Sequence, residues 1–379
     1  MTRASAAPRA VVAGGGILGT WHAVELVAAG FRVDHLEADV DPAGASVRNF
    51  GLVWVSGRRS GAELEVALRA RRRWEEAGAL VPDLGFRPTG SLTVARTERE
   101  RRVMEDFARQ PEAAARGIGF VGTDDVRTCN PAIGGVTHGA LFCSEDAVVE
   151  PRRALGALRA HLSESAPERY RFHPRTRVVG LGARSLVDAT ATRWEGDLAV
   201  VATGAAYDHL PGTGGIGTRL RRVRLQMLET EPLARTLTTS IADADSLRYY
   251  PAYESARLAD LGEQTPVAAA HHLQLLLVQR PDGGLTIGDT HQYGEPFDFA
   301  LSDAPSAELL ARAEAILGVA LPPVRERWEG VYAQCLDGGV CLREEIEQGV
   351  FVVTGPGGRG MTCAPAIAAD TLVAAGVAA

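Results

Sequence analysis

Three glycines near the start of the chain, Gly14, Gly16 and Gly19, follow an apolar segment with the spacing G-x-G-x-x-G. The apolar segment predicts a buried strand, and residues 17–29 predict a helix. The first glycine permits a tight turn, the second lets backbone approach a pyrophosphate, and the third lets the helix lie close to the sheet. Glu37, at the end of a second predicted strand, can accept hydrogen bonds from a ribose. These residues predict a dinucleotide site with phosphates at the positive end of a helix.

A second glycine-rich junction lies near the C terminus, where the apolar residues 350–354 run into 355–362 and then a predicted helix. Its backbone N–H groups suit the pyrimidine edge of a flavin, which gathers negative charge on reduction. An NAD-dependent dehydrogenase would leave this junction without a purpose, so FAD is favoured over NAD. A nucleotide-binding protein without redox turnover is the alternative from another class.

The chain contains no lysine, and all 40 of its basic residues are arginine. Schiff-base enzymes, pyridoxal phosphate enzymes and Walker-type phosphate loops each need a lysine amine, so these classes are excluded. A net charge of −7 with interspersed signs argues against a nucleic-acid partner. The five cysteines lack C-x-x-C spacing, and the neighbours His271 and His272 would point to opposite faces of a strand, so no metal site is expected.

The chain has no run of about 18 apolar residues, so we expect no membrane partner and a soluble cytoplasmic protein, either monomer or homodimer. Its 379 residues suit two lobes. Nucleotide-type βα segments occur at the start, middle and end, whereas the intervening part contains β-type runs, among them 223–229, 272–279 and 285–288. We predict a discontinuous FAD-binding domain and an inserted substrate-binding domain. The first comprises residues 1–85, 147–222 and 328–379, and the second residues 86–146 and 223–327.

Ten segments in this order carry a resemblance to a known family: 14–19, Glu37, 46–49, 89–92, 149–151, 176–178, 200–204, 285–288, 328–330 and 355–362. Through them the chain resembles the FAD-dependent amine and amino-acid oxidases of the D-amino-acid oxidase, glycine oxidase and sarcosine oxidase family. The resemblance implies an α/β fold: a Rossmann-like FAD-binding domain of the glutathione-reductase type with an inserted α+β substrate domain built on an antiparallel sheet. Four stretches are similar to a bacterial branch associated with breakdown of aminophosphonates: 45–54, 225–228, 279–283 and 288–293.

Carried over residue by residue, the resemblance implies that the three motif glycines hold the pyrophosphate, Glu37 the ribose and the backbone of Val178 the adenine. Residues 46–49 would line the phosphate and isoalloxazine side, and residues 355–362 would embrace the flavin ring. The predicted cofactor-binding residues are Gly14, Gly16, Ile17, Leu18, Gly19, Glu37, Ala38, Ala45, Ser46, Val47, Arg48, Asn49, Val178, Thr203, Gly204, Gly355, Gly357, Gly358, Arg359, Gly360, Met361 and Thr362. Cys335 lies about two residues out of register with the covalent attachment site of some relatives, so non-covalent FAD is favoured.

The resemblance also implies a reaction. A hydride equivalent passes from the carbon beside an amine nitrogen to the flavin, and the imine hydrolyses to a carbonyl compound. Oxygen would accept the electrons and yield hydrogen peroxide. The best specific substrate is an aminophosphonate related to 2-aminoethylphosphonate. The alternative is a flavin-dependent dehydrogenase that acts on a pathway-specific amine and uses an acceptor other than oxygen.

Two departures from the family bear on substrate and oxidant. Tyr332 stands where amino-acid oxidases of this family clamp a substrate carboxylate with an arginine, so any substrate anion needs another arginine. Thr286 stands where sarcosine-oxidase relatives place a lysine that assists oxygen reduction, so oxygen needs another cation or another acceptor serves. The predicted substrate residues are Arg48, Arg248, Tyr253, His291 and Tyr332, and the catalytic candidates beside the flavin are Tyr332, Arg359 and His291.

Overall fold

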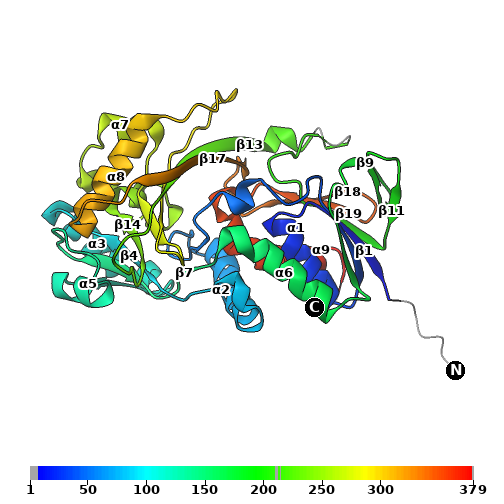
Figure 1. Cartoon of the computed structure of the whole chain (residues 1–379), viewed down its shortest axis with the longest axis horizontal. Helices are drawn as coiled ribbons and strands as arrows, with labels where there is room; N and C mark the ends of the chain where they lie inside the picture. The colour runs from blue at the N-terminus through cyan, green and yellow to red at the C-terminus, as the bar shows by residue number, and fades with distance from the viewer. Residues whose placement is uncertain (1–6, 210–211, 214, 378–379) are drawn as a thin grey trace.

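The computed structural model describes residues 7–209, 212–213 and 215–377. The remaining residues, which include both ends of the predicted FAD-binding domain, lie outside this description. Figure 1 shows an elongated molecule with a six-stranded sheet at one end and an eight-stranded sheet at the other. Two long strands, β13 (Leu220–Thr230) and β17 (Val324–Cys335), run between these two parts.

The six-stranded sheet contains the first strand of the glycine motif. Its order is β18-β19-β12-β1-β2-β8, and its neighbours pair in parallel except for antiparallel β18 and β19. The strands are β1 (Arg9–Ala13), β2 (Arg32–Leu36), β8 (Tyr170–His173), β12 (Leu198–Val201), β18 (Leu342–Glu347) and β19 (Val350–Thr354).

Side chains of β1 alternate between two hydrophobic cores, as the period of two in a strand requires. Ala10 and Val12 pack into a core with four helices, whereas Val11 and Ala13 pack on the other face with Leu186. The helices are α1 (Ile17–Ala28), α2 (Ala62–Leu80), α6 (Pro151–Ser165) and α9 (Gly360–Ala374). A three-stranded sheet, β9 (Val178–Gly182), β10 (Ser185–Asp188) and β11 (Arg193–Glu195), lies on the side away from these helices (Figure 1).

The eight-stranded sheet has the order β17-β13-β16-β15-β14-β4-β6-β5. It is antiparallel except at one place, where β14 pairs with β4 in parallel. The strands besides β13 and β17 are β4 (Ser91–Val94), β5 (Ile118–Val121), β6 (Ala140–Cys143), β14 (Ser240–Asp243), β15 (Leu276–Gln279) and β16 (Leu285–Gly288). A small pair, β3 (Leu52–Val53) and β7 (Ala147–Val148), lies between the two large sheets (Figure 1).

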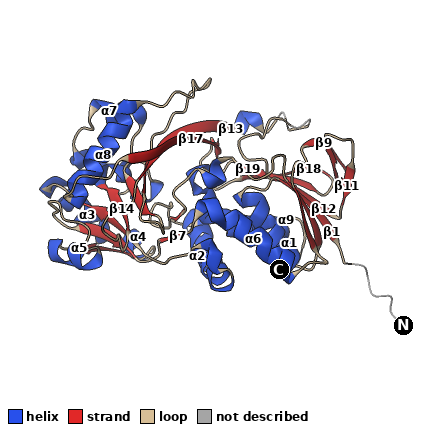
Figure 2. Ribbon diagram, viewed as in Figure 1, coloured by secondary structure: helices blue, strands red, loops and turns tan. Residues whose placement is uncertain are grey.

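Helices gather in two groups, as Figure 2 shows: α1, α2, α6 and α9 on the six-stranded sheet, and the others around the eight-stranded sheet. The second group comprises α3 (Glu98–Ala108), α4 (Pro111–Ala114), α5 (Thr123–Cys129), α7 (Pro266–His271) and α8 (Asp303–Leu317). On β15, Leu277 faces a core with α8, whereas Leu276 and Val278 face the opposite core, which contains Tyr332.

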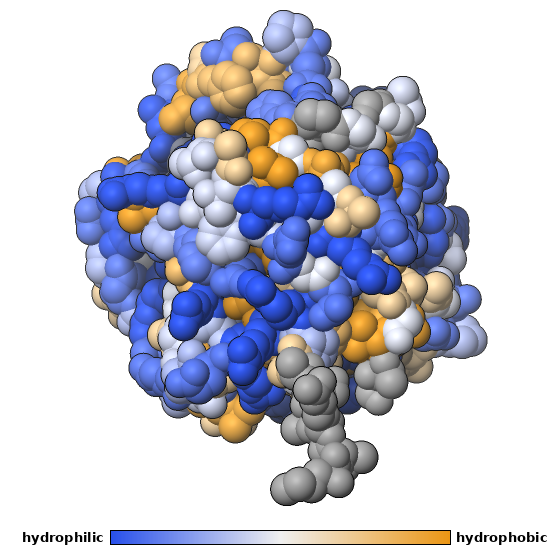
Figure 3. All heavy atoms as spheres, turned by 90° about the vertical axis from the view of Figure 1, so that its right-hand side faces the viewer, coloured by the Kyte–Doolittle hydropathy of each residue, from blue (hydrophilic) through white to orange (hydrophobic). Residues whose placement is uncertain are grey.

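Both long strands cross a predicted domain boundary. β13 begins before residue 223, and β17 begins before residue 328. The two strands pair along their whole length, from Leu220 opposite Cys335 to Thr230 opposite Val324. The division into two domains at the stated residues stays a prediction. Within the described ranges, no helix is long and apolar enough to cross a membrane. The face at the β9–β11 end is mostly hydrophilic, with hydrophobic side chains in separate small patches (Figure 3).

Candidate functional site

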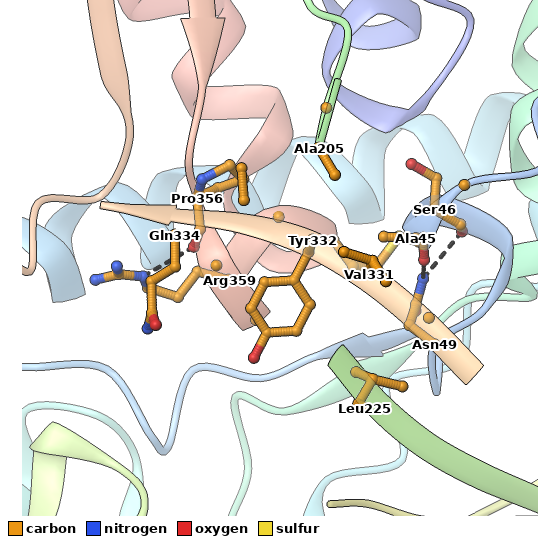
Figure 4. A pocket seen from close by; sticks show the side chains of 18 of the residues that line it. Ala45, Ser46, Asn49, Ala205, Leu225, Val331, Tyr332, Gln334, Pro356 and Arg359 are labelled. Carbon is orange, nitrogen blue, oxygen red and sulfur yellow. Dashed lines mark hydrogen bonds between the residues drawn. The ribbon is translucent and has the colours of Figure 1, made fainter. Parts of the chain in front are cut away.

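A cavity of about 970 Å³ brings together segments from both parts of the molecule. Its walls come from the glycine motif, the loop after β2, the end of β12, the middle of β13 and β17, and the junction before α9. One region of the wall is drawn in Figure 4, where Tyr332 projects from β17 between the Ala45–Asn49 loop and Arg359. The cavity is therefore the place where the sequence motifs meet.

The motif glycines each meet a different steric limit. Gly14 has a φ of +108°, and a Cβ there would lie 2.3 Å from the carbonyl oxygen of Ala202. A Cβ at Gly19 would lie 1.8 Å from the carbonyl oxygen of Gly14, and one at Gly16 3.1 Å from Oγ of Ser46. Helix α1 can therefore start directly on the end of β1, with its N terminus at the cavity wall.

Glu37 is fixed at this wall by two backbone donors. The N–H groups of Gly15 and Asp39 donate to its carboxylate at 2.6 and 3.0 Å. The side chain is almost buried, with 9% of the residue exposed. A carboxylate offers about four lone-pair sites, so acceptor capacity remains for hydroxyl groups of a ligand.

The loop opposite α1 is held by its own side chains. Oγ of Ser46 accepts from the N–H of Ile17 at 2.9 Å, which ties the loop to the first turn of α1. Asn49 donates to the carbonyl oxygens of Ala45 and Ser46, both at 2.9 Å (Figure 4). Arg48 lines the cavity, but its guanidinium donates to the carbonyls of Ala43 and Glu329. This part of the wall is thus held by hydrogen bonds within the chain.

Most predicted cofactor residues line the cavity, and four do not. Gly19 lies under the turn, and Val47 packs against the core beneath α1. Gly355 is enclosed by Leu220 and Cys335, and Thr362 accepts a hydrogen bond from the backbone N–H of Trp54. These four positions shape the wall from behind. The binding roles of the whole set stay predictions.

Two tyrosines meet at the glycine junction before α9. The hydroxyls of Tyr249 and Tyr332 are 3.1 Å apart, and a Cβ at Gly358 would lie 3.8 and 3.9 Å from them. Burial raises the pKa of both phenols well above the usual value. Both remain neutral at ordinary pH, so Tyr332 supplies a hydroxyl and no charge to this part of the wall.

His291 stacks on Tyr249, with ring centroids 4.1 Å apart. Its Nδ1 lies 3.1 Å from the carbonyl oxygen of His272, and because a carbonyl only accepts, Nδ1 carries the hydrogen. In the neutral ring Nε2 is then an acceptor, and it lies 3.7 Å from Oδ2 of Asp289. His291 therefore lines the cavity as a polar residue, as predicted, and the contact of Nδ1 defines the tautomer of its neutral ring.

Sequence reasoning missed the two polar residues beyond His291. Asp289 and Gln274 both line the cavity and are 5% and 3% exposed. Nε2 of Gln274 donates to Oδ1 of Asp289 at 2.9 Å, while Oε1 of Gln274 has no hydrogen-bond partner within the described chain. Burial raises the pKa of Asp289, and the nearby His291 opposes that rise. The sequence feature that could have indicated Gln274 is its position as a lone polar residue among leucines 273–277.

The predicted substrate residues Arg248 and Tyr253 have structural partners. Arg248 lines the cavity, but donates to Asp245 at 3.1 Å and to the carbonyls of Leu258 and Gly262 at 3.2 and 2.6 Å. Tyr253 does not line the cavity, because its ring is buried edge-on against Phe107 at 4.8 Å. The contacts of Arg248 and Tyr253 thus hold both side chains against other parts of the chain.

Arg359 is also engaged. It donates to the carbonyls of Pro356, Gly338 and Gly339 at 2.8 to 3.0 Å and to Oε2 of Glu63 at 3.1 Å. The bond to Pro356 is visible in Figure 4. Its guanidinium thereby joins α2, the turn after β17 and the glycine junction, which is a bracing position in the cavity wall.

Neither Cys335 nor Thr286 lines the cavity. Burial raises the pKa of Cys335 to about 11, which keeps the thiol protonated and unreactive. Thr286 donates to Glu229 at 3.1 Å and accepts from Nε of Arg280 at 2.9 Å. In the part of the chain that the structure describes, no group of three His, Cys, Asp or Glu side chains could hold a metal ion.

Comparison with known proteins gives one family match and many similar structures. The sequence model of the DAO family, described as FAD dependent oxidoreductase, matches residues 9–372. An opine oxidase subunit from Rhizobium meliloti is 27% identical over 185 residues, which cover 44% of this chain and 48% of that protein. The aligned part thus spans about half of the relative.

Two solved structures cover almost the whole chain. Glycine oxidase from Geobacillus kaustophilus has a TM-score of 0.76 at 20% identity and covers 98% of this chain and 95% of its own. L-proline dehydrogenase from P. horikoshii has a TM-score of 0.77 at 19% identity, with coverage of 98% and 94%. These likenesses confirm the predicted mixed α/β fold with a Rossmann-like FAD-binding part.

Proposed function

The chain belongs to the DAO family of FAD dependent oxidoreductases, and from this premise we propose that it oxidises the C–N bond of a small amine. The residues present fit FAD. The glycine cradle brings the N terminus of α1 to the cavity, Glu37 is held beside it, and Tyr332 and Gly358 meet at the other end. When bound, FAD supplies the acceptor for the two electrons of the C–N bond.

The continuity of this cavity is the observation that carries the proposal. Gly14 and Glu37 line the same cavity as Tyr332 and His291. A dinucleotide held at the first pair would thus share a space with a small molecule held at the second pair. Such a shared space positions a substrate against a cofactor and excludes bulk water.

His291 has a role in proton transfer. Oxidation of a C–N bond needs the neutral amine, whereas a small amine enters as its ammonium form at ordinary pH. In the neutral tautomer whose Nδ1 donates to the carbonyl of His272, Nε2 of His291 has a free lone pair and takes the proton that the ammonium releases. Tyr249, stacked on the imidazole ring, holds its plane in place.

The finer proposal is an aminophosphonate related to 2-aminoethylphosphonate, with oxygen as acceptor. Four sequence stretches that are similar to the aminophosphonate branch support it, and three of them, 45–54, 225–228 and 288–293, contribute residues to the cavity wall. One amine, one oxygen molecule and one water then yield one aldehyde, one ammonia and one hydrogen peroxide. Non-covalent FAD, a cytoplasmic location and a monomeric or homodimeric state stay predictions.

The test is a product balance with 2-aminoethylphosphonate, in which aldehyde, ammonia and peroxide are measured against oxygen consumed. The proposal expects a ratio of one to one for each product. Its matched control is 2-hydroxyethylphosphonate, which keeps the anion and carbon skeleton and replaces the C–N bond by C–O. Oxidation of the control instead of the amine would overturn the assignment.

A second candidate is an amine dehydrogenase that transfers electrons to an acceptor other than oxygen. The absence of lysine favours it, as does Thr286, whose hydroxyl bonds to Glu229 and Arg280 away from the cavity. Turnover with the dye dichlorophenolindophenol under nitrogen, at a rate far above the rate in air without dye, would select this candidate over an oxidase.

A further inference from the structure

Arg58 is the buried cavity arginine whose guanidinium has the fewest partners among the described residues. It is 3% exposed and lines the cavity. Nε donates to the carbonyl of Trp54 at 2.8 Å. NH1 lies 3.8 Å from Oε1 of Glu63, and neither terminal nitrogen makes a hydrogen bond within the described residues. Four N–H donors are thus available at a buried position.

The charge around Arg58 is positive. Glu63 lies between two guanidiniums, because Oε2 accepts from Arg359 at 3.1 Å and Oε1 faces Arg58. Oε1 has no hydrogen-bond partner within the described chain. Two guanidinium groups and one carboxylate sum to one positive charge in this wall. An anion that binds Arg58 in place of Glu63, which lies 3.8 Å away, would balance this positive charge.

The wall at Gln274, Asp289 and His291 has the opposite character. Oε1 of Gln274 has no hydrogen-bond partner within the described chain, and Oδ2 of Asp289 lies 3.7 Å from Nε2 of His291. The wall therefore offers three kinds of acceptor: an unpartnered amide oxygen, a buried carboxylate and, in the neutral tautomer of His291, an imidazole nitrogen. A primary ammonium group offers three N–H donors and a positive charge, which is the complement of this set.

Two tyrosine rings separate these walls. The guanidinium of Arg58 lies 5.8 Å from the ring centre of Tyr250, Tyr250 lies 5.2 Å from Tyr249, and Tyr249 lies 4.1 Å from His291. Burial is the main cause that raises the pKa of both tyrosines, Asp289 adds to the rise, and Arg58 opposes it. The charges of Arg58 and Asp289 therefore both act on the phenol groups of Tyr249 and Tyr250.

We propose that this cavity has a bipolar substrate site, in which Arg58 binds the anion of a zwitterionic amine and Asp289 with Gln274 binds its ammonium group. The inference rests on the proposed amine oxidation and names the residues that select the substrate. In this arrangement the arginine that binds the anion comes from the loop before α2. Arg248 and Arg359, both committed to several backbone carbonyls, act as braces in this arrangement.

The test separates the two charges with probes that cannot be oxidised. Ethylphosphonate carries only the anion, and tert-butylamine carries only an ammonium group and has no hydrogen on the carbon beside nitrogen. Each probe is titrated into the FAD-loaded protein, and the dissociation constant is read from the change in visible flavin absorbance. Binding is then measured without turnover.

Arg58→Met should weaken ethylphosphonate at least tenfold, as expected for a charge-assisted hydrogen bond, and leave tert-butylamine within about twofold. Asp289→Asn should do the reverse. Arg59→Met is the matched control: Arg59 is the next residue and also lines the cavity, but its side chain is half exposed and pairs with Glu254 at 2.9 Å. It should leave both constants unchanged, although it removes the same charge.

The proposal is overturned when wild type binds neither probe, when either variant leaves both constants unchanged or weakens both equally, or when Arg59→Met reproduces the loss. Should Arg58→Met fail to hold flavin, Arg58→Lys carries the test, because it keeps the charge and loses the fork, and a tenfold loss for ethylphosphonate alone is expected. If both probes bind as described but 2-aminoethylphosphonate is not oxidised, the proposed function fails while the bipolar site stands.

Discussion

Replacing Gly19 by alanine should weaken both the fold and flavin binding, although alanine normally favours a helix. The added methyl group would lie 1.8 Å from the carbonyl oxygen of Gly14 and 3.0 Å from its carbonyl carbon. Both contacts are backbone atoms, so α1 must move away from the end of β1.

The expected size follows from two opposing effects. Overpacking of this kind costs about 3 kcal/mol, at the upper end of the usual range, because backbone has to shift. Exchange of glycine for alanine in a helix returns about 1 kcal/mol. The net loss in the free energy of unfolding is then about 2 kcal/mol. Movement of α1 also shifts the N–H groups at its N terminus, so the ratio of bound FAD to protein should fall.

Gly156 provides the matched control, because it lies inside helix α6 and nothing lies within 4 Å of a Cβ placed there. Gly156→Ala should stabilise the protein by up to about 1 kcal/mol and leave the flavin ratio unchanged. Urea unfolding and the absorbance ratio at 450 and 280 nm measure both quantities. A Gly19→Ala protein as stable as Gly156→Ala, with full flavin, would refute the close packing of α1 on the motif.

Three further predictions concern the cofactor and stability. Glu37→Gln should weaken FAD binding about tenfold in titrations of the apoprotein, because the carboxylate becomes a weaker acceptor beside Gly15 and Asp39, and unchanged affinity would remove Glu37 from the ribose site. Acid precipitation should release all the flavin, and Cys335→Ala should hold as much as wild type; flavin that stays with the precipitated protein would contradict non-covalent binding. Burial lowers the pKa of His22 and of His35 to about 4 from 6.5, so the folded state binds fewer protons than the unfolded state, and stability present above pH 6.5 is lost as the pH falls toward 4. The loss between pH 7.5 and pH 5 is about 2 kcal/mol for each histidine, and His35→Gln should reduce the pH dependence of urea unfolding; an unchanged slope would contradict it.

The parts of the site that depend on local sequence could be predicted. The turn between β1 and α1 uses residues that are neighbours along the chain, so the spacing of Gly14, Gly16 and Gly19 shows their purpose directly. The position of Glu37 follows from the length of one helix and one strand. For the same reason strand β19 and the helix that starts at Gly360 could be predicted.

At the substrate end, His291 and Tyr332 could be named from the sequence, whereas Arg58, Gln274 and Asp289 could not, because their positions depend on distant parts of the chain. Arg58 is one of 40 arginines, and its burial depends on Tyr250, nearly 200 residues later. Arg248 is a reasonable clamp by residue type, yet besides Asp245 its partners are the carbonyl oxygens of Leu258 and Gly262, which no side-chain pattern indicates.

The predicted strand 272–279 is shorter in the structure, and the difference matters for the site. His272 adopts a left-handed conformation with φ of 44°, which ends α7, and the strand begins only at Leu276. Gln274 lies in the irregular segment between them and donates to Asp289. The regular strand predicted for 272–279 does not imply that the amide of Gln274 lies beside the carboxylate of Asp289.

The central claim, that this protein oxidises a C–N bond, is tested most directly by the visible spectrum under anaerobic conditions. The purified protein is mixed in turn with glycine, sarcosine, D-alanine, 2-aminoethylphosphonate and 2-hydroxyethylphosphonate. The account predicts that the flavin band near 450 nm bleaches with 2-aminoethylphosphonate and persists with its hydroxy analogue. Bleaching by the hydroxy analogue, or a band that no amine reduces, would contradict it.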